Sequence, residues 1–181
     1  MIQSLSDSFD LAALHQELEI PASYALQRKL NVQPEAAAVE LVPITQGAVR
    51  EIHLQRAAAE AWFRLSARAA SDGIELQPLS GFRSIARQAE IIRRKRHRGA
   101  SISEILRVNA APGYSEHHTG RAIAIGTSGF LPLDQTFEQS AAFGWLSHHA
   151  PQFGFTLSYP AINSRGIGFE PWHWCWNGTP P

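Results

Sequence analysis

The C-terminal segment, residues 169–176, constrains the fold more than any other part of the sequence. Tryptophan alternates there with histidine and cysteine, in the order Trp172, His173, Trp174, Cys175, Trp176. This two-residue period is typical of a β-strand, whose successive side chains point to opposite faces. Three tryptophans on one face require an apolar core behind the strand, which leaves the histidine and the cysteine on the other face. The segment therefore predicts a strand with one core face and one polar face.

The composition fits a single core of this kind. The 181 residues are 44% hydrophobic and 18% charged, which are ordinary values for a globular domain. Sixteen Lys and Arg balance sixteen Asp and Glu, so no net field attracts nucleic acid or an anionic membrane surface. No stretch approaches the roughly 18 apolar residues of a membrane span. We expect no nucleic-acid partner and no membrane span, and the residues point to no particular oligomeric state.

The N-terminal residues and the cysteine content bear on the compartment. Residues 1–20 contain no Lys or Arg and no long apolar run, so no secretory signal is visible. Cys175 is the single cysteine and cannot form an intramolecular disulfide. We expect a cytoplasmic protein, with the cell envelope as the alternative if a leader has been removed.

Hydrophobic periodicity predicts an α+β fold in which helices pack on one face of an antiparallel sheet. Prolines interrupt the first 44 residues, which we predict to form an N-terminal wrap around one globular unit, residues 45–181. We expect helices over 47–71, 84–98 and 137–149 and a short one after Ser101, and strands over 74–79, 122–125, 155–159 and 168–176.

A basic run, residues 93–98, ends the second of these helices. Cations near a helix C-terminus complement the helix dipole, and their long side chains extend into water. We therefore interpret the run as a solvated helix end rather than an anion-binding patch.

Glu170 stands three positions before His173, with Pro171 between them. In a regular strand Glu170 would point to the tryptophan face, but proline marks an edge or a bulge that can turn it towards His173. A carboxylate beside an imidazole suits a general base next to a metal ligand. A structural glutamate and a core histidine explain this pair equally well.

Two further segments give the pair a context. Residues 80–84 read Ser-Gly-Phe-Arg-Ser, and residues 115–125 read Ser-Glu-His-His-Thr-Gly-Arg-Ala-Ile-Ala-Ile. With residues 170–174 they resemble the patterns S-G-[YF]-R-S, S-x-H-x-x-G-x-A-x-D and E-P-W-H-W of the VanY-type D-alanyl-D-alanine carboxypeptidases. These are zinc enzymes related to D,D-dipeptidases and to the hedgehog signalling domain fold. The resemblance covers about half of the chain, in the family's order.

The resemblance implies a hedgehog-like D,D-peptidase fold, a Zn²⁺ cofactor and a peptidoglycan peptide or D-Ala-D-Ala-ended precursor as partner. Its residue roles are carried over by position. His117 and His173 match the two histidine zinc ligands, Glu170 the general base, Arg83 the arginine that steadies the polarised carbonyl or the substrate carboxylate, and Gln88 and Ser115 the polar residues that line the substrate site.

One position departs from the family pattern. Where the family has its aspartate zinc ligand, seven residues after His117, this chain has Ala124. A methyl group cannot bind zinc, so we expect metal binding to weaken by more than the roughly 10 to 100-fold of an outer-shell change. An engineered Asp→Ala substitution is the explanation we favour, because the other motif positions are intact. A natural non-hydrolysing binder is a second explanation. A third is a metal site rebuilt with Cys175, for which His118 and Glu116 are poorer substitutes, since neighbours of His117 in extended backbone point away from it.

The function predicted on these grounds is a zinc-dependent D-alanyl-D-alanine carboxypeptidase or dipeptidase that Ala124 inactivates or impairs. A catalytically dead module that binds D-Ala-ended cell-wall peptides is one alternative. An L,D-carboxypeptidase or L-alanyl-D-glutamate endopeptidase is another.

Overall fold

The computed structural model describes residues 10–45 and 51–178 and has an α+β architecture. Among these residues no helix is both long and apolar enough to cross a membrane. The α-helices are α1 (Leu11–Glu17), α2 (Tyr24–Arg28), α3 (Arg56–Ser71), α4 (Ile85–His97), α5 (Ile102–Val108) and α6 (Ala141–His149). Short 3-10 helices are η1 (Ala38–Glu40), η2 (Glu116–Thr119), η3 (Gln135–Gln139) and η4 (Ala150–Phe153).

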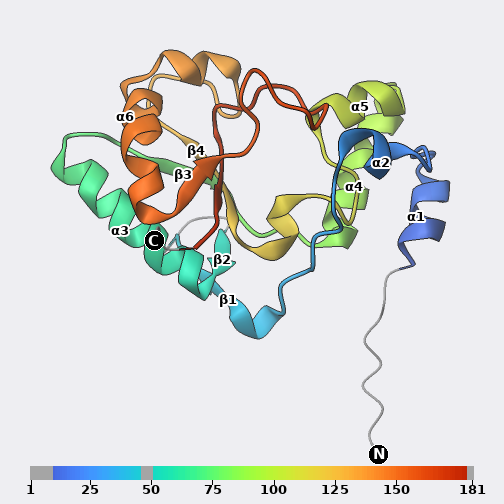
Figure 1. Cartoon of the computed structure of the whole chain (residues 1–181), viewed down its shortest axis with the longest axis horizontal. Helices are drawn as coiled ribbons and strands as arrows, with labels where there is room; N and C mark the ends of the chain where they lie inside the picture. The colour runs from blue at the N-terminus through green and yellow to red at the C-terminus, as the bar shows by residue number, and fades with distance from the viewer. Residues whose placement is uncertain (1–9, 46–50, 179–181) are drawn as a thin grey trace, which may run out of the picture.

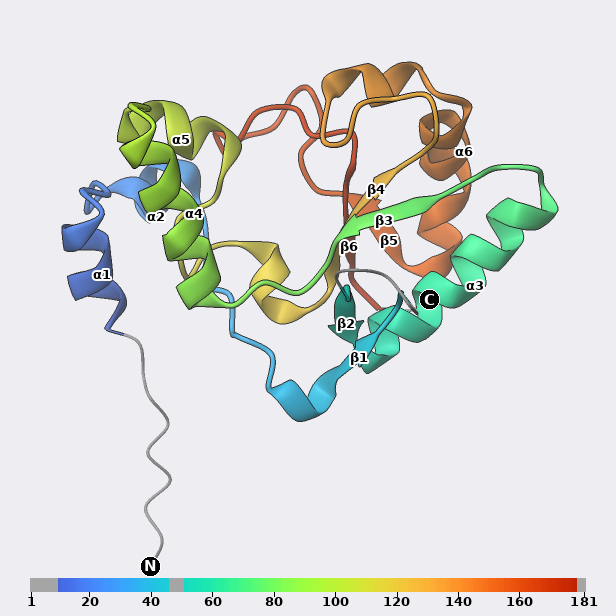
Figure 2. The ribbon, with the colours of Figure 1, turned by 180° about the vertical axis from the view of Figure 1, so that it is seen from behind.

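Two antiparallel sheets hold the strands. The smaller pairs β1 (Leu41–Pro43) with β2 (His53–Gln55). The larger has the order β3-β4-β6-β5 and is formed by β3 (Gln77–Ser80), β4 (Ala122–Gly126), β5 (Phe155–Leu157) and β6 (His173–Trp176). It lies in the middle of the molecule (Figure 2).

The register of the larger sheet fixes which side chains share a face. Ala124 on β4 is opposite Ser80 on one neighbouring strand and opposite His173 on the other. Directly opposed residues in antiparallel strands point to the same side. Ser80, Ala124 and His173 therefore form one row across the sheet.

The opposite face of the sheet is the core face predicted from the tryptophan alternation. Trp174 is 2% exposed and packs in the main core, and Trp172 and Trp176 contact that core while half-buried. Helices α3 and α6 cover this face, and Figure 1 shows both on one side of the sheet. The prediction of helices packed on one face is confirmed. The sheet and these helices contribute Trp62, Leu65, Ile123, Ile125, Leu146 and Trp174, among others, to the core.

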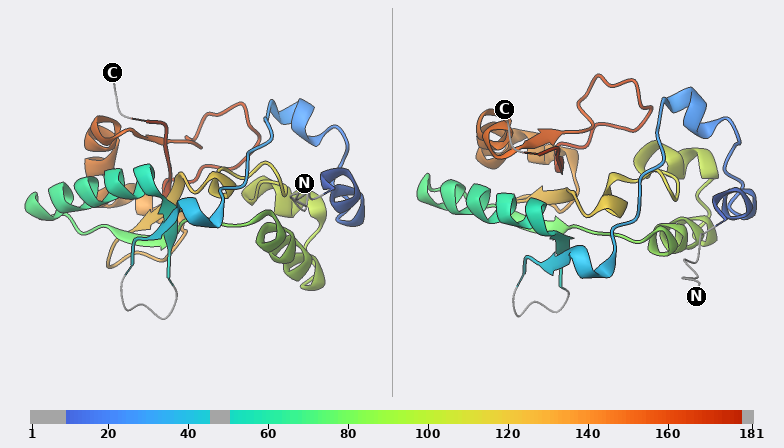
Figure 3. Two further views of the ribbon diagram at one scale, coloured as in Figure 1. Left: turned by 90° about the horizontal axis from the view of Figure 1, so that it is seen from below. Right: turned by 60° about the horizontal axis from the view of Figure 1, so that its bottom comes forward.

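A second apolar cluster joins α1, α2, α4 and α5 on the far side of the molecule (Figure 1). Leu14, Leu18 and Tyr24 pack there against Ile92 and Ile105. After α2 the chain crosses the molecule to β1, which lies on the side of α3 (Figure 3). Helices α1 and α2 thus lie against α4 and α5, while the division at residue 44 stays a prediction.

Three predicted elements begin four or more residues away from the expected start. The first long helix begins at Arg56 rather than near 47, because residues 53–55 pair with β1; positions 47 and 49 of the predicted helix lie outside the described residues. The helix expected over 137–149 is interrupted at Ser140, whose hydroxyl accepts from Phe143 N and begins α6. The last strand begins at His173 rather than near 168, because Glu170 and His173 close a turn around Pro171.

Candidate active site

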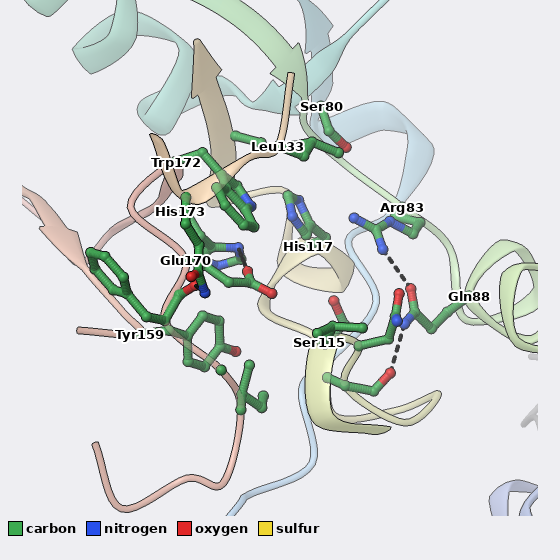
Figure 4. A pocket seen from close by; sticks show the side chains of 18 of the residues that line it. Ser80, Arg83, Gln88, Ser115, His117, Leu133, Tyr159, Glu170, Trp172 and His173 are labelled. Atoms are coloured by element: carbon green, nitrogen blue, oxygen red, sulfur yellow. Dashed lines mark hydrogen bonds and ion pairs between the residues drawn. The ribbon is translucent and has the colours of Figure 1, made fainter. Parts of the chain in front are cut away.

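A cavity of about 410 Å³ lies on the polar face of the larger sheet. Its wall is formed by β3, β4, the start of β6, α4 and the loops between them. Figure 4 shows Arg83 and Gln88 on one side of the cavity, Glu170 and His173 on the other, and His117 between them. The structure brings together all the residues singled out from the motifs: Arg83, Gln88, Ser115, His117, Ala124, Glu170 and His173.

His117 is fixed by the backbone around it. Its Nδ1 donates to the carbonyl oxygen of Gly81 at 2.7 Å, which leaves Nε2 as the nitrogen with a free lone pair. Gly81 has no room for a side chain, because a Cβ there would collide with the His53 carbonyl oxygen and lie 2.8 Å from an Ile52 methyl. Burial, together with the Arg83 charge, holds the pKa of His117 well below its usual range. His117 is therefore a neutral imidazole.

His173 is held by two carboxylates. Its Nε2 donates to Oε2 of Glu116 at 3.0 Å, and its Nδ1 lies 3.5 Å from Oε2 of Glu170. A hydrogen bond from one ring nitrogen orients the ring and sets its tautomer, as in the carboxylate–histidine pairs of metal sites. The rings of His117 and His173 are 4.8 Å apart between centroids. The two unprotonated ring nitrogens thus belong to neighbouring rings in one cavity.

Glu116, considered from the sequence only as a poor substitute for the missing zinc ligand, is the hydrogen-bond partner of His173. The expected extended backbone around His117 is wrong, because residues 116–119 form the 3-10 helix η2, which turns Glu116 towards His173. Its other oxygen accepts from Arg165 Nη1 at 3.0 Å. Burial opposes its charge, but the hydrogen bond and charge of His173 hold the pKa of Glu116 at about 2. An acidic neighbour of the motif histidine was visible, but its partner is 57 residues away in the chain.

Glu170 reaches the cavity through the turn that precedes β6. His173 N donates to the Glu170 carbonyl at 3.0 Å, with Pro171 inside the turn. The predicted approach of Glu170 to His173 is therefore achieved by a turn rather than by a bulge. Burial raises the pKa of the Glu170 carboxyl, against the opposing charges of His173 and Arg83. A carboxylate with a raised pKa is suited to accept and return a proton near neutral pH.

Arg83 is oriented by Gln88. Arg83 Nη1 donates to Gln88 Oε1 at 2.7 Å, and Gln88 Nε2 donates to the Ala110 carbonyl at 2.6 Å. Gln88 is 1% exposed. Its side-chain amide is therefore held in place and orients the guanidinium of Arg83. The sequence assigned Gln88 to the substrate wall, and the structure adds this positioning contact. Ser115, which is 4% exposed, lies on the same wall.

His118 has a structural place beside the site. Gly113 N donates to its Nε2 at 3.1 Å, so its Nδ1 carries the proton and donates to the Arg83 carbonyl at 2.6 Å. Both ring nitrogens are used by backbone groups. His118 therefore braces the Arg83 loop and does not line the cavity.

Two aromatic residues, Tyr159 and Trp172, complete the wall, although the sequence pattern assigned Trp172 to the core face alone. Tyr159, 3% exposed, lies with its ring centroid 4.8 Å from that of His173. Trp172 lines the cavity on the same side as His173 (Figure 4). Tyr159 stood in no motif, so the sequence offered no signal for it.

Ala124 decides whether the residues present fit a three-ligand zinc site. It is 2% exposed, lines the cavity and is paired with His173 in the sheet. Cys175 does not complete the set, because it is not part of the cavity wall and burial raises the pKa of its thiol to about 12. In the part of the chain that the structure describes, no three His, Cys, Asp or Glu side chains are placed to hold one metal ion. Two imidazoles and a methyl group do not fit such a site.

Residues 51–179 match the family VanY: D-alanyl-D-alanine carboxypeptidase. The match covers most of the chain, so the chain belongs to this family.

Curated relatives include the putative carboxypeptidase YodJ of Bacillus subtilis, 32% identical over 69% of this chain and 46% of the relative. The bifunctional D-Ala-D-Ala dipeptidase and D-Ala-D-Ala carboxypeptidase VanXYC of Enterococcus gallinarum is 29% identical over 72% of this chain and 70% of the relative. The chain thus spans about half the length of the Bacillus relative.

Solved structures with this fold include the LD-carboxypeptidase LdcB, with a TM-score of 0.69 and 29% identity over 82% of this chain and 75% of the other. VanYB in complex with D-alanine-D-alanine has a TM-score of 0.65 and 26% identity over 82% of each chain. A mutant of the D,D-pentapeptidase VanY in complex with Zn(II) has a TM-score of 0.63 and 25% identity over 82% of this chain and 86% of the other.

Proposed function

We propose that this cavity binds the D-alanine end of peptidoglycan peptides or their precursors. We further propose that the chain is a zinc-dependent D-alanyl-D-alanine carboxypeptidase or dipeptidase whose hydrolytic step Ala124 severely impairs. The proposal is carried by one observation, that His117, His173, Glu170 and Arg83 converge on a single cavity in a chain of this family.

The residues divide the work in this proposal. Arg83 presents a guanidinium fork, held by Gln88, to the terminal carboxylate or to the carbonyl oxygen that gains charge during hydrolysis. Glu170 holds and moves the proton, because its raised pKa lies closer to neutral pH. Ala124 supplies no donor at the position where the family has aspartate. Zinc binding by two imidazoles alone is weak in this proposal, and the chain is inactive or severely impaired.

Hydrolysis of acetyl-L-Lys-D-Ala-D-Ala in the presence of zinc tests the proposal through released D-alanine. We expect Ala124→Asp to raise the rate at least about 1000-fold, because general base catalysis and a third ligand act together. Ala124→Asn is the matched control, since it has the same shape without the charge, and should stay slow. Equal rates for the unaltered chain and Ala124→Asp would contradict the proposed impairment.

A binding module for D-Ala-ended wall peptides is the second candidate. It is favoured by the intact support of Arg83, in which Gln88 links the guanidinium to the Ala110 carbonyl while Ala124 leaves the metal position without a donor. If Ala124→Asp takes up zinc and hydrolyses no wall peptide, the binding function is the better account.

An L,D-carboxypeptidase activity is a third candidate, favoured by the similarity to the LD-carboxypeptidase LdcB over 82% of this chain. The product profile of Ala124→Asp on purified muropeptides separates these activities. Release of D-alanine from pentapeptides indicates D,D-specificity, release from tetrapeptides indicates L,D-specificity, and internal cleavage indicates an endopeptidase.

A further inference from the structure

Lys95 lines the cavity but belongs to none of the motifs. It belongs to α4 and stands seven residues after Gln88, so the two side chains are on the same side of the helix. Val108, Asn109 and Ala110 line the same cavity. The basic run at the end of α4, which the sequence predicts to be a solvated helix end, therefore has one member that faces the cavity.

Two of the neighbouring cations have carboxylate partners, unlike Lys95. Arg93 forms an ion pair with Glu17 at 2.7 Å, and Arg96 forms one with Glu19 at 2.8 Å. The ammonium group of Lys95 has no hydrogen bond and no ion pair with any residue that the structure describes. Its side chain is half-buried. Lys95 thus brings to the cavity wall a positive charge that has no contact partner among the described residues.

The charges around Lys95 favour an incoming anion. Burial lowers its pKa and the charge of Arg83 lowers it further, while the attraction of Glu170 acts in the opposite direction. An anion bound beside the ammonium would stabilise its charged form against burial and against repulsion by Arg83. Arg83 is already assigned to the terminal carboxylate or the polarised carbonyl, so Lys95 is available for a second acidic group.

Spacing along α4 indicates where that group lies on the peptide. Seven residues at 1.5 Å rise separate Gln88 and Lys95 by about 10 Å along the helix. An extended peptide covers about 3.3 to 3.6 Å per residue, so this distance corresponds to about three residues. The second acidic group is expected on the third or fourth residue from the C-terminus.

We propose that Lys95 is a specificity-determining residue that binds a carboxylate on the third or fourth residue from the D-alanine end of the peptide. The inference rests on the proposed function, because the position of the peptide end at Arg83 defines the spacing. It narrows the substrate class to wall peptides that carry an acidic residue close to their D-alanine end.

The test compares peptides that differ only in one carboxylate. Acetyl-Glu-D-Ala-D-Ala is matched with acetyl-Gln-D-Ala-D-Ala, and acetyl-Glu-Ala-D-Ala-D-Ala with acetyl-Gln-Ala-D-Ala-D-Ala. Their Kd values are measured by isothermal titration calorimetry on the chain as it stands. In at least one pair we expect the acidic peptide to bind about tenfold more tightly, as a hydrogen bond to a charged group does. The preference should shrink as salt is added.

Variants of α4 assign that preference to one side chain. We expect Lys95→Gln to abolish it and Lys95→Arg to retain it. Arg94→Gln is the matched control, because it removes a cation from the adjacent, exposed position of the same helix, and it should leave the preference unchanged. Thermal melts of each variant check that it is folded.

Three results separate the inference from the proposed function. Equal Kd values for the acidic and amide peptides in both pairs overturn the inference alone, as does a preference that survives Lys95→Gln. If no D-Ala-D-Ala peptide binds more tightly than its L-Ala-L-Ala counterpart, the proposed function is overturned and the inference falls with it.

Discussion

The cavity has an arginine end, at Arg83, and a histidine end, at His117 and His173. The first has all the residues of the family pattern, and the second lacks one. At the arginine end, Arg83 is supported by Gln88, and Gln88 is in turn bonded to the Ala110 carbonyl. At the histidine end, His117 and His173 are equally well held, by Gly81 and Glu116, but the neighbouring position in the sheet carries the methyl group of Ala124. In the proposed function, binding of the peptide end depends on the arginine end of the cavity and metal binding depends on the histidine end. Each can therefore be altered without the other.

The largest expected effect is on the histidine end alone. In the Ala124→Asp background, Glu170→Gln should lower kcat about 1000-fold, because general acid–base catalysis contributes roughly 100 to 10,000-fold. KM should stay within about threefold, since Arg83 still holds the peptide. Steady-state release of D-alanine measures both constants. A fall in kcat of less than about fivefold would remove Glu170 from the chemistry.

The converse change affects the arginine end alone. In the unaltered chain, Arg83→Lys should weaken binding of acetyl-L-Lys-D-Ala-D-Ala about 30 to 100-fold, because an ammonium lacks the planar fork that binds a carboxylate through two donors. Calorimetry gives the Kd. The zinc affinity of Ala124→Asp with and without Arg83→Lys is the control, and a change of more than about threefold there would break the separation of the two ends.

Substitution of Glu116 tests whether zinc binding at the histidine end depends on the hydrogen-bond partner of His173. In the Ala124→Asp background, Glu116→Leu should weaken zinc binding about 10 to 100-fold, because His173 loses the acceptor that sets its tautomer and orientation. Glu116→Gln retains an acceptor and should lose less.

Nitrogen-15 chemical shifts of His173, measured without metal, supply an independent readout for Glu116. They should report protonated Nε2 in the unaltered chain and mixed tautomers in Glu116→Leu. Unchanged shifts in that variant would show that Glu116 does not position the ring.

The smallest expected effect concerns Arg165, which contacts Glu116 from a side chain that is 42% exposed. Exposed ion pairs contribute about 0.2 to 1 kcal/mol. Arg165→Gln should therefore weaken zinc binding by Ala124→Asp about fivefold at most, with no effect on peptide binding. A chelator competition assay resolves this change, and a loss as large as that of Glu116→Leu would mean that Arg165 is required to hold Glu116 in place.

Much of the fold follows from local patterns that a sequence displays directly. The alternation around Trp174 specified the core face of β6, and the Ser101 and Glu104 pair formed the capping box that begins α5. The β1–β2 pair could not be predicted, because each strand is three residues long and depends on a partner elsewhere in the chain. The start of α3 was misplaced for the same reason, since residues 53–55 pair with β1 instead of joining the helix.

In the candidate site, too, residues that stand in a local motif could be predicted, and contacts between distant segments could not. His117, His173, Glu170 and Arg83 could be predicted because each stands in a short motif. The role of Glu116 depends on a contact with His173 across 57 residues, and no local pattern carries it. Lys95 lies in a run of six basic or titratable residues, and only the packing of α4 determines which member faces the cavity.

We propose that the side chain at position 124, and no other part of the cavity, limits metal binding. Competition with a chromophoric zinc chelator at neutral pH measures it directly on the unaltered chain, Ala124→Asp and Ala124→Asn. We expect Ala124→Asp to bind one zinc per chain at least about 100-fold more tightly than the unaltered chain, and Ala124→Asn to bind zinc about as weakly as the unaltered chain. One zinc bound per unaltered chain, with an affinity equal to that of Ala124→Asp, would contradict it.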